Sequence, residues 1–375
     1  MKKKLYRVTT ISGSLNGLLK GQLRYLNNYF EVVGVASDTG NLKDVEIEQG
    51  IRTINIKMAR EISLLQDIKS LWALYKLFRK DRPDIVHANT PKASLLSMVA
   101  AWATRVPNRI YLVTGLRFET TRGAKRFILK TMERITCLCA TKVIPEGDGV
   151  KNTLRREKIT RKPLQKIHHG NINGIDMSHF NRTEEVNEKA SSIRKPGVFT
   201  FVFIGRIVRD KGVNELVEAF NKITKERDDV RLLLLGRFED ELDPVLPITR
   251  DIINNNKFID FVGYQNDVRP YLVASDVLIL PSYREGFPNV ILQAGAMGIP
   301  CIVTDINGCN EAIINGENGI IIPKQDSNAL YEAMNHLMDN KDIYNKMAQK
   351  ARPLISSRYD QKDLWNALLE MYNSL

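Results

Sequence analysis

The feature that constrains the fold most is an alternation of short β-rich runs with longer helical runs, which passes twice through the 375 residues. The short runs are almost continuously apolar, as in strands that are buried on both faces of a sheet. In the longer runs the apolar residues recur every three or four positions, as on one side of a helix. This alternation favours parallel strands joined by crossover helices, and therefore an α/β fold with helices on both faces of each sheet.

The first series of elements fills the first half of the chain. Strands are expected at 5–10, 31–36, 85–88, 109–113 and 142–145. Helices are expected at 15–29, 62–78, 93–103, 124–140 and 149–154. The residues from 13 to 17, rich in Gly and Ser, are expected to form a turn that faces a ligand.

The second series starts again at residue 198. Strands are expected at 198–204, 230–235, 277–280 and 301–303, and helices at 213–225, 285–295, 312–314 and 327–340. The charged stretch 184–195 is expected to be a linker, and a break is expected at Arg352-Pro353. Because 375 residues exceed what one core usually holds, the predicted domains are 1–182 and 183–355. A last helix within 356–375 is expected to return to the first domain.

The two halves of the chain differ in charge. Residues 1–182 hold 33 Lys and Arg against 15 Asp and Glu, whereas residues 183–375 hold 22 against 28. A basic half suits an anionic partner such as a nucleic acid, a lipid surface or a phosphorylated substrate. Nucleic acid is disfavoured, because aromatic residues form only 7% of the chain and no stacking motif interleaves with the basic runs.

The composition also bounds the location and the chemistry. The basic start imitates a signal peptide, but Thr, Ser and Gly residues interrupt the apolar stretch that follows, so a cytoplasmic protein is expected. The longest apolar run, 95–104, is about half of the ~20 residues that a membrane-spanning helix needs. The four cysteines lack metal spacing and are expected to be reduced thiols. Without an Asp-x-Asp motif or a His/Asp cluster, neither a metal nor another cofactor is expected.

The most informative segment is 280–294, Leu-Pro-Ser-Tyr-Arg-Glu-Gly-Phe-Pro-Asn-Val-Ile-Leu-Gln-Ala. A buried strand ends there, a polar turn presents Glu285, and Pro288 suits the first turn of a helix. Backbone N–H groups at that helix start are expected to bind a diphosphate with the help of the helix dipole. Glu285 and Gln293 are eight residues apart, so both are expected to address one elongated ligand. The binding candidates of the segment are Gly286, Phe287, Pro288, Asn289 and Gln293.

A second segment, 203–212, follows the first strand of the second series. Gly205 lets the chain turn and lets a ligand approach the backbone. Arg206 and Lys211 place two cations at the strand's end, which suits two adjacent phosphates. Taken alone, these charges fit a solvated loop equally well. Beside the first segment they form a set of two cations, a helix N-terminus and a carboxylate.

In this order the motifs resemble those of the retaining glycosyltransferases of family 4, and the resemblance covers nearly the whole chain. It implies an α/β structure of the GT-B type, with two Rossmann-like doubly wound parallel-sheet domains facing across a cleft. It also implies a hexosyltransferase that takes its sugar from a UDP-sugar. The matching positions are 173–176, 205–212, 234–236, 261–263, 285–294, 298–300 and 315–319.

The resemblance gives roles to these positions. Arg206 and Lys211 are expected to neutralise the donor's diphosphate and to stabilise it as it leaves, and Glu285 is expected to contact the donor sugar. Gly236 belongs to the second nucleotide-binding strand. Gln293 stands where the family usually has a Glu that bonds the ribose hydroxyls. An amide can still accept from one hydroxyl and donate to the other.

The first half departs from the family at one further position. Many relatives carry a His where this chain has Thr114. Its absence is compatible with front-side attack, in which the leaving diphosphate receives the acceptor's proton. The protein then supplies mainly positioning and electrostatic stabilisation.

Within the family, the first half is most similar to bacterial N-acetylhexosaminyltransferases. These enzymes build capsule, O-antigen or glycoprotein glycans on a polyprenyl diphosphate carrier. The resembling segments are 9–15, 86–93 and 115–119. His87 also fits a strand-end His with a structural hydrogen bond, which is the interpretation that we favour. The acceptor-binding candidates are Ser14, Asn16, Gly17, His87, Lys92 and Arg117.

Basic residues further along the first half suit a lipid-linked acceptor. Segment 122–142 interleaves basic and apolar residues, as in a helix that lies on an anionic membrane, although a helix with its apolar side in the core has the same pattern. The run 151–166 is also basic. Residues expected to line a path for the diphosphate carrier are Lys92, Arg117, Arg122, Lys125, Arg126 and Lys130.

The expected protein is therefore a peripheral enzyme at the inner face of the cell membrane. Its expected partners are a UDP-sugar donor, a polyprenyl-diphosphate-linked acceptor and an anionic membrane surface. One alternative is a UDP-sugar 2-epimerase, which needs paired acids and a His for proton transfer. Another is a glycosyltransferase whose acceptor carries no lipid.

Overall fold

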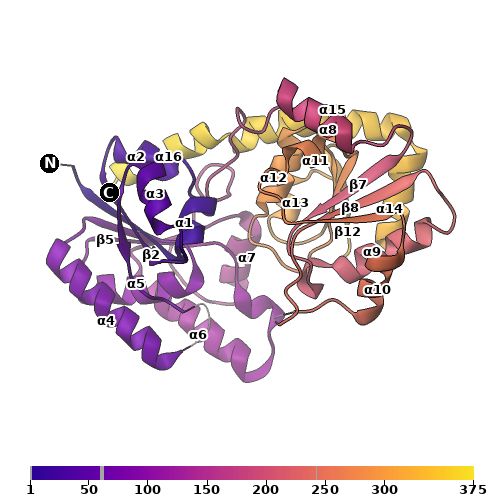
Figure 1. The fold of residues 1–375 in the computed structure, drawn as a ribbon. Coiled ribbons are helices and arrows are strands. Elements are labelled where there is room, and N and C mark those ends of the chain that lie inside the picture. The colour runs from indigo at the N-terminus through magenta and orange to yellow at the C-terminus, as the bar shows by residue number, and fades with distance from the viewer. Residues whose placement is uncertain (1, 60–62, 242) are drawn as a thin grey trace. The chain divides into compact units, whose positions relative to one another are not determined.

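The computed structural model describes residues 2–59, 63–241 and 243–375. The chain divides into two compact units (Figure 1). The first contains Met1–Asn173 together with Lys362–Leu375, and the second contains Gly174–Gln361. Each unit has a parallel sheet with helices on both faces, which confirms the predicted α/β class.

The first sheet has six strands among the described residues, in the order β3-β2-β1-β4-β5-β6. The order reverses between β1 and β4, which pair from Leu5 and Ile85 to Val8 and Ala88. In doubly wound sheets, ligands lie at the carboxyl ends of the strands beside such a reversal. The strands are β1 (Lys4–Ile11), β2 (Glu31–Ser37), β3 (Arg52–Asn55), β4 (Ile85–Ala88), β5 (Asn108–Val113) and β6 (Lys142–Pro145).

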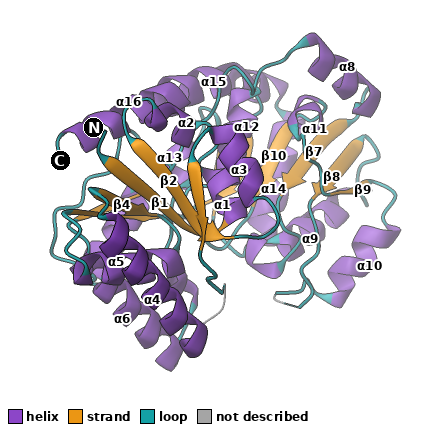
Figure 2. Ribbon diagram, turned by 60° about the vertical axis from the view of Figure 1, so that its left-hand side comes forward, coloured by secondary structure: helices purple, strands orange, loops and turns teal. Residues whose placement is uncertain are grey.

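Two groups of helices cover the two faces of the first sheet (Figure 2). On one face lie α1 (Ser12–Leu18), α2 (Gln22–Asn27), α3 (Leu42–Gln49) and α16 (Gln361–Asn373). On the other lie α4 (Leu64–Asp81), α5 (Pro91–Ala103), α6 (Gly123–Cys139) and α7 (Asp148–Arg156), with the short turn η1 (Arg117–Thr120). Alternate strand residues such as Leu5 and Tyr6 enter the two cores. The last helix completes one of these cores through Leu368 and Tyr372.

The second sheet repeats the topology within Gly174–Gln361. Its six strands among the described residues follow the order β12-β11-β10-β7-β8-β9, with the reversal between β7 and β10. They are β7 (Phe199–Ile204), β8 (Val230–Leu235), β9 (Ile259–Gly263), β10 (Val277–Leu280), β11 (Cys301–Thr304) and β12 (Gly319–Ile322). The helical segments are α8 (Glu184–Ile193), η2 (Arg209–Lys211), α9 (Val213–Ile223), α10 (Pro247–Asn255), α11 (Arg269–Val273), α12 (Asn289–Ala296), α13 (Cys309–Ala312), α14 (Ser327–Asp339) and α15 (Lys341–Tyr359).

Two predictions in the first series were wrong in detail. The single helix expected at 15–29 is two helices, because Gly21 adopts a φ of 80° between them. The turn expected from 13 to 17 lies inside α1, which begins directly after β1. The helix expected at 62–78 is α4, and its predicted first residue, Ile62, lies outside the described residues.

The predicted linker 184–195 is largely the helix α8. Thr183 caps it, because its hydroxyl accepts a hydrogen bond from the backbone N–H of Val186 at 3.4 Å. Val186 and Ala190 are four residues apart, so they lie on one side of the helix, and both are buried. The charges that suggested a linker occupy the solvent side of this helix.

The break expected at Arg352-Pro353 is also absent, since α15 continues through Pro353. A proline inside a helix costs roughly 3 kcal/mol or more, so packing must stabilise this one. Ile355 contacts the site where a side chain on Gly295 would lie. The Arg352 guanidinium donates hydrogen bonds to the carbonyl groups of Ala296 and Phe180. Tertiary contacts on both sides of the proline thus hold the helix together.

No helix within the described ranges is both long enough and apolar enough to cross a membrane.

Candidate functional site

The loops after β7, β8 and β10 meet at the carboxyl edge of the second sheet. The backbone of Gly236, with φ 152°, passes so close to Gly205 that a side chain there would overlap the Gly205 carbonyl oxygen. Gly212, with φ 70°, lies equally close to the carbonyl oxygen of Pro281. Both contacts require glycine. They bring the two motifs predicted from the sequence together beside the reversal in strand order.

The charged side chains of this edge pair with one another. Lys211 Nζ contacts Glu285 Oε1, and both side chains are largely buried. Arg206 Nη1 lies 2.8 Å from Glu239 Oε2 at a more exposed position. Predicted catalytic residues from two separate motifs are therefore in direct contact. A phosphate that approached this edge would meet two cations whose positions are already fixed by carboxylates.

The loop that carries Glu285 is held by residues that the sequence did not single out. The Tyr283 hydroxyl donates to Glu215 Oε1 at 2.5 Å. The backbone N–H of Tyr283 donates to the Asp210 carbonyl at 2.9 Å, and Arg284 Nη2 donates to Asp210 Oδ2 at 2.9 Å. Burial and the neighbouring Glu215 raise the pKa of Tyr283 above its ordinary value. These partners come from other elements, so spacing along the chain did not reveal them.

The helix after this loop starts later than predicted. α12 begins at Asn289, so Glu285 lies in the loop and not on the helix. Pro288 is the N-cap residue with φ −75° and ψ 112°. A proline disfavours the helical conformation for the residue before it, and it has no N–H to offer a ligand. The idea that Glu285 and Gln293 share one helix was therefore wrong.

The remaining donor-binding candidates surround the start of α12. Phe287 is buried, and its ring centroid lies 5.3 Å from that of Tyr359. Gly286 and Asn289 are half-buried beside it, and Gln293 is a half-buried residue of α12. Phe287 therefore serves as an anchor for the loop, whereas the others retain exposed surface.

Hydrogen bonds between neutral groups join the strand ends at the carboxyl edge of the first sheet. Thr90 Oγ1 accepts from the backbone N–H of Thr10 at 2.8 Å. The Thr114 hydroxyl donates to the Asn89 carbonyl at 2.8 Å. These bonds connect the ends of β1, β4 and β5. The charged pairs of this edge involve the first turns of the helices that follow, as in Lys92 with Asp67 and Lys166 with Asp148.

The acceptor-binding candidates differ in what they can reach. Ser14 and Asn16 are half-buried on α1, and Gly17 is exposed there. Arg117 is exposed at the start of η1. Lys92, in the first turn of α5, forms an ion pair with Asp67 of α4, with Nζ 2.7 Å from Oδ1.

His87 lies in the core of the first unit and not at its surface. Its Nδ1 is 2.5 Å from the Tyr372 hydroxyl on α16. Arg7, also fully buried, donates to the same hydroxyl at 3.2 Å. Burial, and to a smaller extent the charge of Arg7, holds the pKa of His87 well below its ordinary value, so the imidazole is neutral. The structural hydrogen bond favoured for this residue is present.

Several of the basic residues expected to line a carrier path are paired within the unit. Arg126 and Lys130 lie 2.9 and 2.8 Å from the carboxylate of Glu157. Lys162, from the second basic run, donates to the carbonyl groups at the end of α6. Arg122 and Lys125 are exposed at the start of α6. The first turn of α6 is therefore the part of this path that faces solvent.

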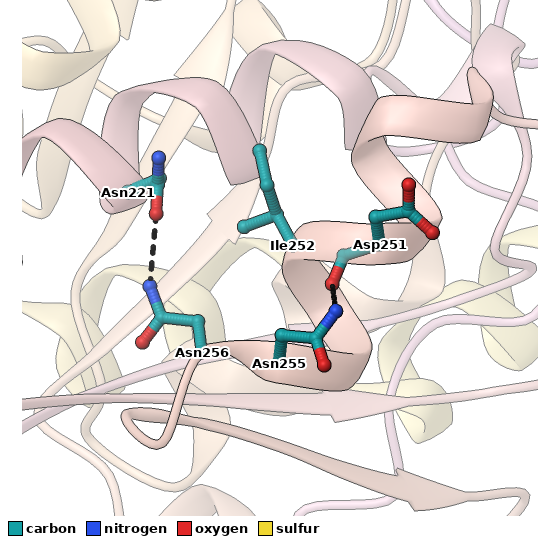
Figure 3. A pocket seen from close by; sticks show the side chains of 5 residues that line it. All are labelled: Asn221, Asp251, Ile252, Asn255 and Asn256. Carbon is teal, nitrogen blue, oxygen red and sulfur yellow. Dashed lines mark hydrogen bonds between the residues drawn. The ribbon is translucent and has the colours of Figure 1, made fainter.

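The described residues contain no metal site, and a hollow beside α10 lies away from the charged edge. Among the described residues, no group of three or more His, Cys, Asp or Glu side chains could hold a metal ion. A shallow hollow of about 320 Å³ lies between α9 and α10 (Figure 3). Its amides bond nearby groups, as when Asn256 Nδ2 donates to Asn221 Oδ1 at 3.1 Å and Asn255 Nδ2 donates to the Asp251 carbonyl at 2.9 Å. It lies at the C-terminal ends of these helices, away from the loop of Glu285.

Two family models match the chain. Residues 198–340 match the model described as glycosyl transferases group 1, and residues 11–146 match the model described as glycosyl transferase 4-like. The chain belongs to this family of glycosyltransferases. The matched regions of this glycosyltransferase contain the carboxyl edges of both sheets, where the predicted site residues lie.

Individual relatives agree with this assignment. The capsular polysaccharide biosynthesis glycosyltransferase CapM of Staphylococcus aureus is 32% identical, over 99% of this chain and 97% of its own. The UDP-Gal:alpha-D-GlcNAc-diphosphoundecaprenol alpha-1,3-galactosyltransferase of Escherichia coli is 30% identical, over 89% of this chain and 86% of its own.

A solved structure matches the fold. The Anabaena HepE protein in complex with UDP aligns with a TM-score of 0.81 and 19% identity, over 100% of both chains. At that identity the likeness shows the fold alone. The two doubly wound sheets of this glycosyltransferase are those of the GT-B fold, as predicted.

Proposed function

We propose that this glycosyltransferase moves an N-acetylhexosamine from a UDP-sugar to a glycan on a lipid diphosphate, with retention of configuration and without a metal ion. The reaction serves the assembly of a bacterial surface polysaccharide or a glycoprotein glycan. It takes place at the inner face of the cell membrane, with the protein peripheral to an anionic lipid surface. The observation that carries the proposal is the contact of Lys211 with Glu285 at the carboxyl edge of the second sheet.

That contact supports a nucleotide-sugar site because it joins the two kinds of group that such a donor needs. Lys211 and Arg206 supply positive charge for the diphosphate, and Glu285 supplies a carboxylate for sugar hydroxyls. Gly205 and Gly236 have no side chains, so a ligand can approach the backbone closely beside these charged groups. The E. coli relative uses UDP-Gal by its name, which supports a UDP-sugar here.

The choice of acceptor rests on different observations. The E. coli relative acts, by its name, on a sugar linked to diphosphoundecaprenol, and the S. aureus relative takes part in capsular polysaccharide biosynthesis. The excess of Lys and Arg in the first 182 residues suits a diphosphate carrier in an anionic membrane. We assign the acceptor to the carboxyl edge of the first sheet, near Ser14, Asn16, Gly17 and Arg117.

The proposed mechanism uses the leaving group as the base. The bond between the sugar's C1 and the diphosphate oxygen breaks, and the acceptor oxygen bonds to C1 on the same face. The acceptor's proton passes to the departing diphosphate. Lys211 and Arg206 stabilise the charge that develops on UDP, a contribution that preorganised cations make most effectively in a site with little water. Because the diphosphate takes the proton, the neutral, buried His87 is not needed as a base.

The test is an assay of UDP release. The purified protein is incubated with UDP-N-acetylglucosamine, UDP-N-acetylgalactosamine or UDP-galactose, with and without a diphosphate-linked sugar on a short prenyl chain. UDP released only with the acceptor, and unaffected by a chelator, supports the proposal. The anomeric configuration of the product, read by NMR, tests retention.

The alternatives give different results in the same assay. A 2-epimerase would change the donor without any acceptor. A transferase with a non-lipid acceptor would be inactive on every prenyl diphosphate sugar and active on a free sugar. The first result would overturn the proposed reaction, and the second would overturn the proposed acceptor. UDP released only when UDP-galactose is the donor would correct the identity of the transferred sugar alone.

A further inference from the structure

One surface of the first unit combines exposed apolar and basic side chains in a way that the proposed sites do not use. It is the outer side of α4, defined here as the α4 face: Leu64, Leu65, Ile68, Lys69, Trp72, Lys76, Arg79 and Lys80. The opposite side of the helix packs into the core through Leu74 and Phe78. α4 therefore buries apolar side chains in its second half and exposes others to solvent in its first half, which is unusual for the surface helix of a globular protein.

The exposure of these residues is large. The exposed fractions are 76% for Leu64, 79% for Leu65, 64% for Ile68 and 56% for Trp72. Residues 65, 68 and 72 follow the helical spacing of three and four, so they form one stripe and not scattered positions. A contiguous apolar stripe on a soluble protein marks an interaction surface.

The second half of the α4 face is basic. Lys76, Arg79 and Lys80 are exposed, and Lys69 lies within the apolar stripe. The Lys76 ammonium is 5.4 Å from the centre of the Trp72 ring, which in turn stacks on Tyr75 at 5.2 Å. An ordered Trp beside cations suits the boundary between lipid headgroups and acyl chains.

The acidic side chains of α4 itself do not offset this charge. Asp67 pairs with Lys92, and Asp81 pairs with Arg52 at 2.8 Å and accepts a hydrogen bond from the Tyr6 hydroxyl at 2.5 Å. Both acids of α4 are thus directed to neighbours within the unit, and the face keeps its positive charge.

The position of the stripe relates it to the proposed acceptor site. Lys92 lies in the first turn of α5, four residues after the end of β4, so its pair with Asp67 holds the first turn of α4 at the carboxyl edge of the first sheet. α4, α5 and α6 lie side by side on one face of that sheet (Figure 2). α6 also begins at that edge, after β5, and its first turns expose Phe127 and Ile128. Two helices therefore present apolar side chains where a lipid-linked acceptor would arrive.

We propose that the α4 face docks on an anionic lipid bilayer, with Leu64, Leu65, Ile68 and Trp72 inserted at the headgroup boundary and the basic residues on lipid phosphates. A second copy of the chain is the weaker choice, because protein interfaces are depleted in Lys and two strongly basic surfaces repel each other. The role of this contact, which is to bring the acceptor edge to the membrane, rests on the proposed function. The lipid contact itself is measurable without turnover.

The experiment is flotation with vesicles of phosphatidylcholine alone or mixed with phosphatidylglycerol. The apolar variant is Leu65→Gln/Ile68→Gln/Trp72→Gln, since Gln keeps a high helix propensity. The basic variant is Lys76→Gln/Arg79→Gln/Lys80→Gln. A matched control, Leu246→Gln/Ile248→Gln, changes exposed apolar residues of the second unit, which are 51% and 62% exposed.

The wild type is expected to float with the anionic vesicles. The apolar variant should partition about 10-fold or more weakly. The basic variant should lose the preference for phosphatidylglycerol, roughly fivefold for each charge removed. The control should float like the wild type. The proposal is overturned if the apolar variant floats unchanged, or if the wild type is a dimer without lipid and the apolar variant a monomer.

Activity measurements separate this proposal from the proposed function. With a short-chain acceptor in solution, the α4 variants should release UDP at the wild-type rate, and with a long-chain acceptor in vesicles they should be slower. A wild type that floats but releases no UDP with either acceptor refutes the proposed function and leaves the docking surface intact. Equal rates for all variants on the vesicle-borne acceptor refute the role of the α4 face.

Discussion

The two units share a sheet topology but place their ionisable side chains differently. The carboxyl edge of the second sheet carries two ion pairs, Lys211 with Glu285 and Arg206 with Glu239. A ligand at this edge can bind these charged groups. In the first unit, buried ionisable groups such as Arg7, His87 and Glu133 lie inside the core. Neutral hydroxyls join the ends of its strands β1, β4 and β5, and the charged pairs of its edge involve the helices that follow.

This difference matches the chemistry that each unit is proposed to perform. A diphosphate donor needs cations that are accessible yet fixed in position, because charge develops on it during the reaction. An acceptor hydroxyl needs only to be oriented. In the proposed function, the same doubly wound sheet would serve two kinds of ligand, and the loops after its strands would decide which.

The largest expected effect concerns the charged edge. Lys211→Ala should lower kcat about 10²- to 10³-fold, because it removes a preorganised cation from the leaving diphosphate. UDP release measures it, and the melting temperature should stay close to that of the wild type. Lys225→Ala, an exposed lysine of the same unit, is the control. Similar rates for both variants would show that the pair of Lys211 with Glu285 is merely structural.

The next effect tests the buried charges of the first unit through pH. Burial raises the pKa of Glu133 to about 7, from an ordinary 4.5, while Tyr111 Oη donates to its carboxylate at 2.6 Å. Between these two values the unfolded chain releases the proton and the folded chain keeps it, so the free energy of unfolding falls as pH rises from about 4.5 to about 7. Glu133→Gln should remove this fall, worth about 2–3 kcal/mol.

Thermal unfolding at a series of pH values measures that effect. Glu48→Gln changes an exposed carboxylate and should leave the pH dependence as it is in the wild type. Parallel curves for the wild type and Glu133→Gln would mean that the buried carboxylate of α6 does not titrate in this range.

A smaller effect is expected where the last helix joins the first unit. Tyr372→Phe removes the hydroxyl that hydrogen-bonds both His87 and Arg7, so each of these buried side chains loses one hydrogen bond. The free energy of unfolding should fall by about 1–3 kcal/mol, as measured by urea denaturation. Tyr264→Phe, at an exposed position, should cost far less. Equal losses would contradict a buried polar network in this core.

The smallest effect concerns Gln293, which stands where the family resemblance implies Glu. Gln293→Glu should change the rate of UDP release by less than about threefold, since a carboxylate and an amide can both bond ribose hydroxyls. Gln293→Leu, which keeps the size but removes both polar atoms, should raise KM for the UDP-sugar. A collapse of activity in Gln293→Glu would show that the second unit's edge does not tolerate another negative charge.

Much of the fold was predictable because its signals are local. The apolar runs 198–204 and 230–235 became the strands β7 and β8 of the second sheet. Short edge elements were missed. β3 has four residues without a buried side chain, so it carries no hydrophobic pattern that a sequence could reveal.

The sequence indicated which residues belong to the candidate site but not which of them contact each other. Lys211 and Glu285 were chosen as separate motifs, 74 residues apart, and the fold made them an ion pair. Tyr283 gained Glu215 as a partner in the same way. Such pairs depend on which strands become neighbours, a property that local spacing does not contain.

The sequence by itself determined the α/β class, the two series of strands, the charge difference between the halves and the family motifs. These follow from periodicity and composition, which act over a few residues. Tertiary structure alone decided that His87 is internal, that α15 passes through Pro353, and that α4 keeps Leu65 and Trp72 in solvent. Each of these outcomes depends on what packs against the residue, and packing partners come from distant parts of the chain.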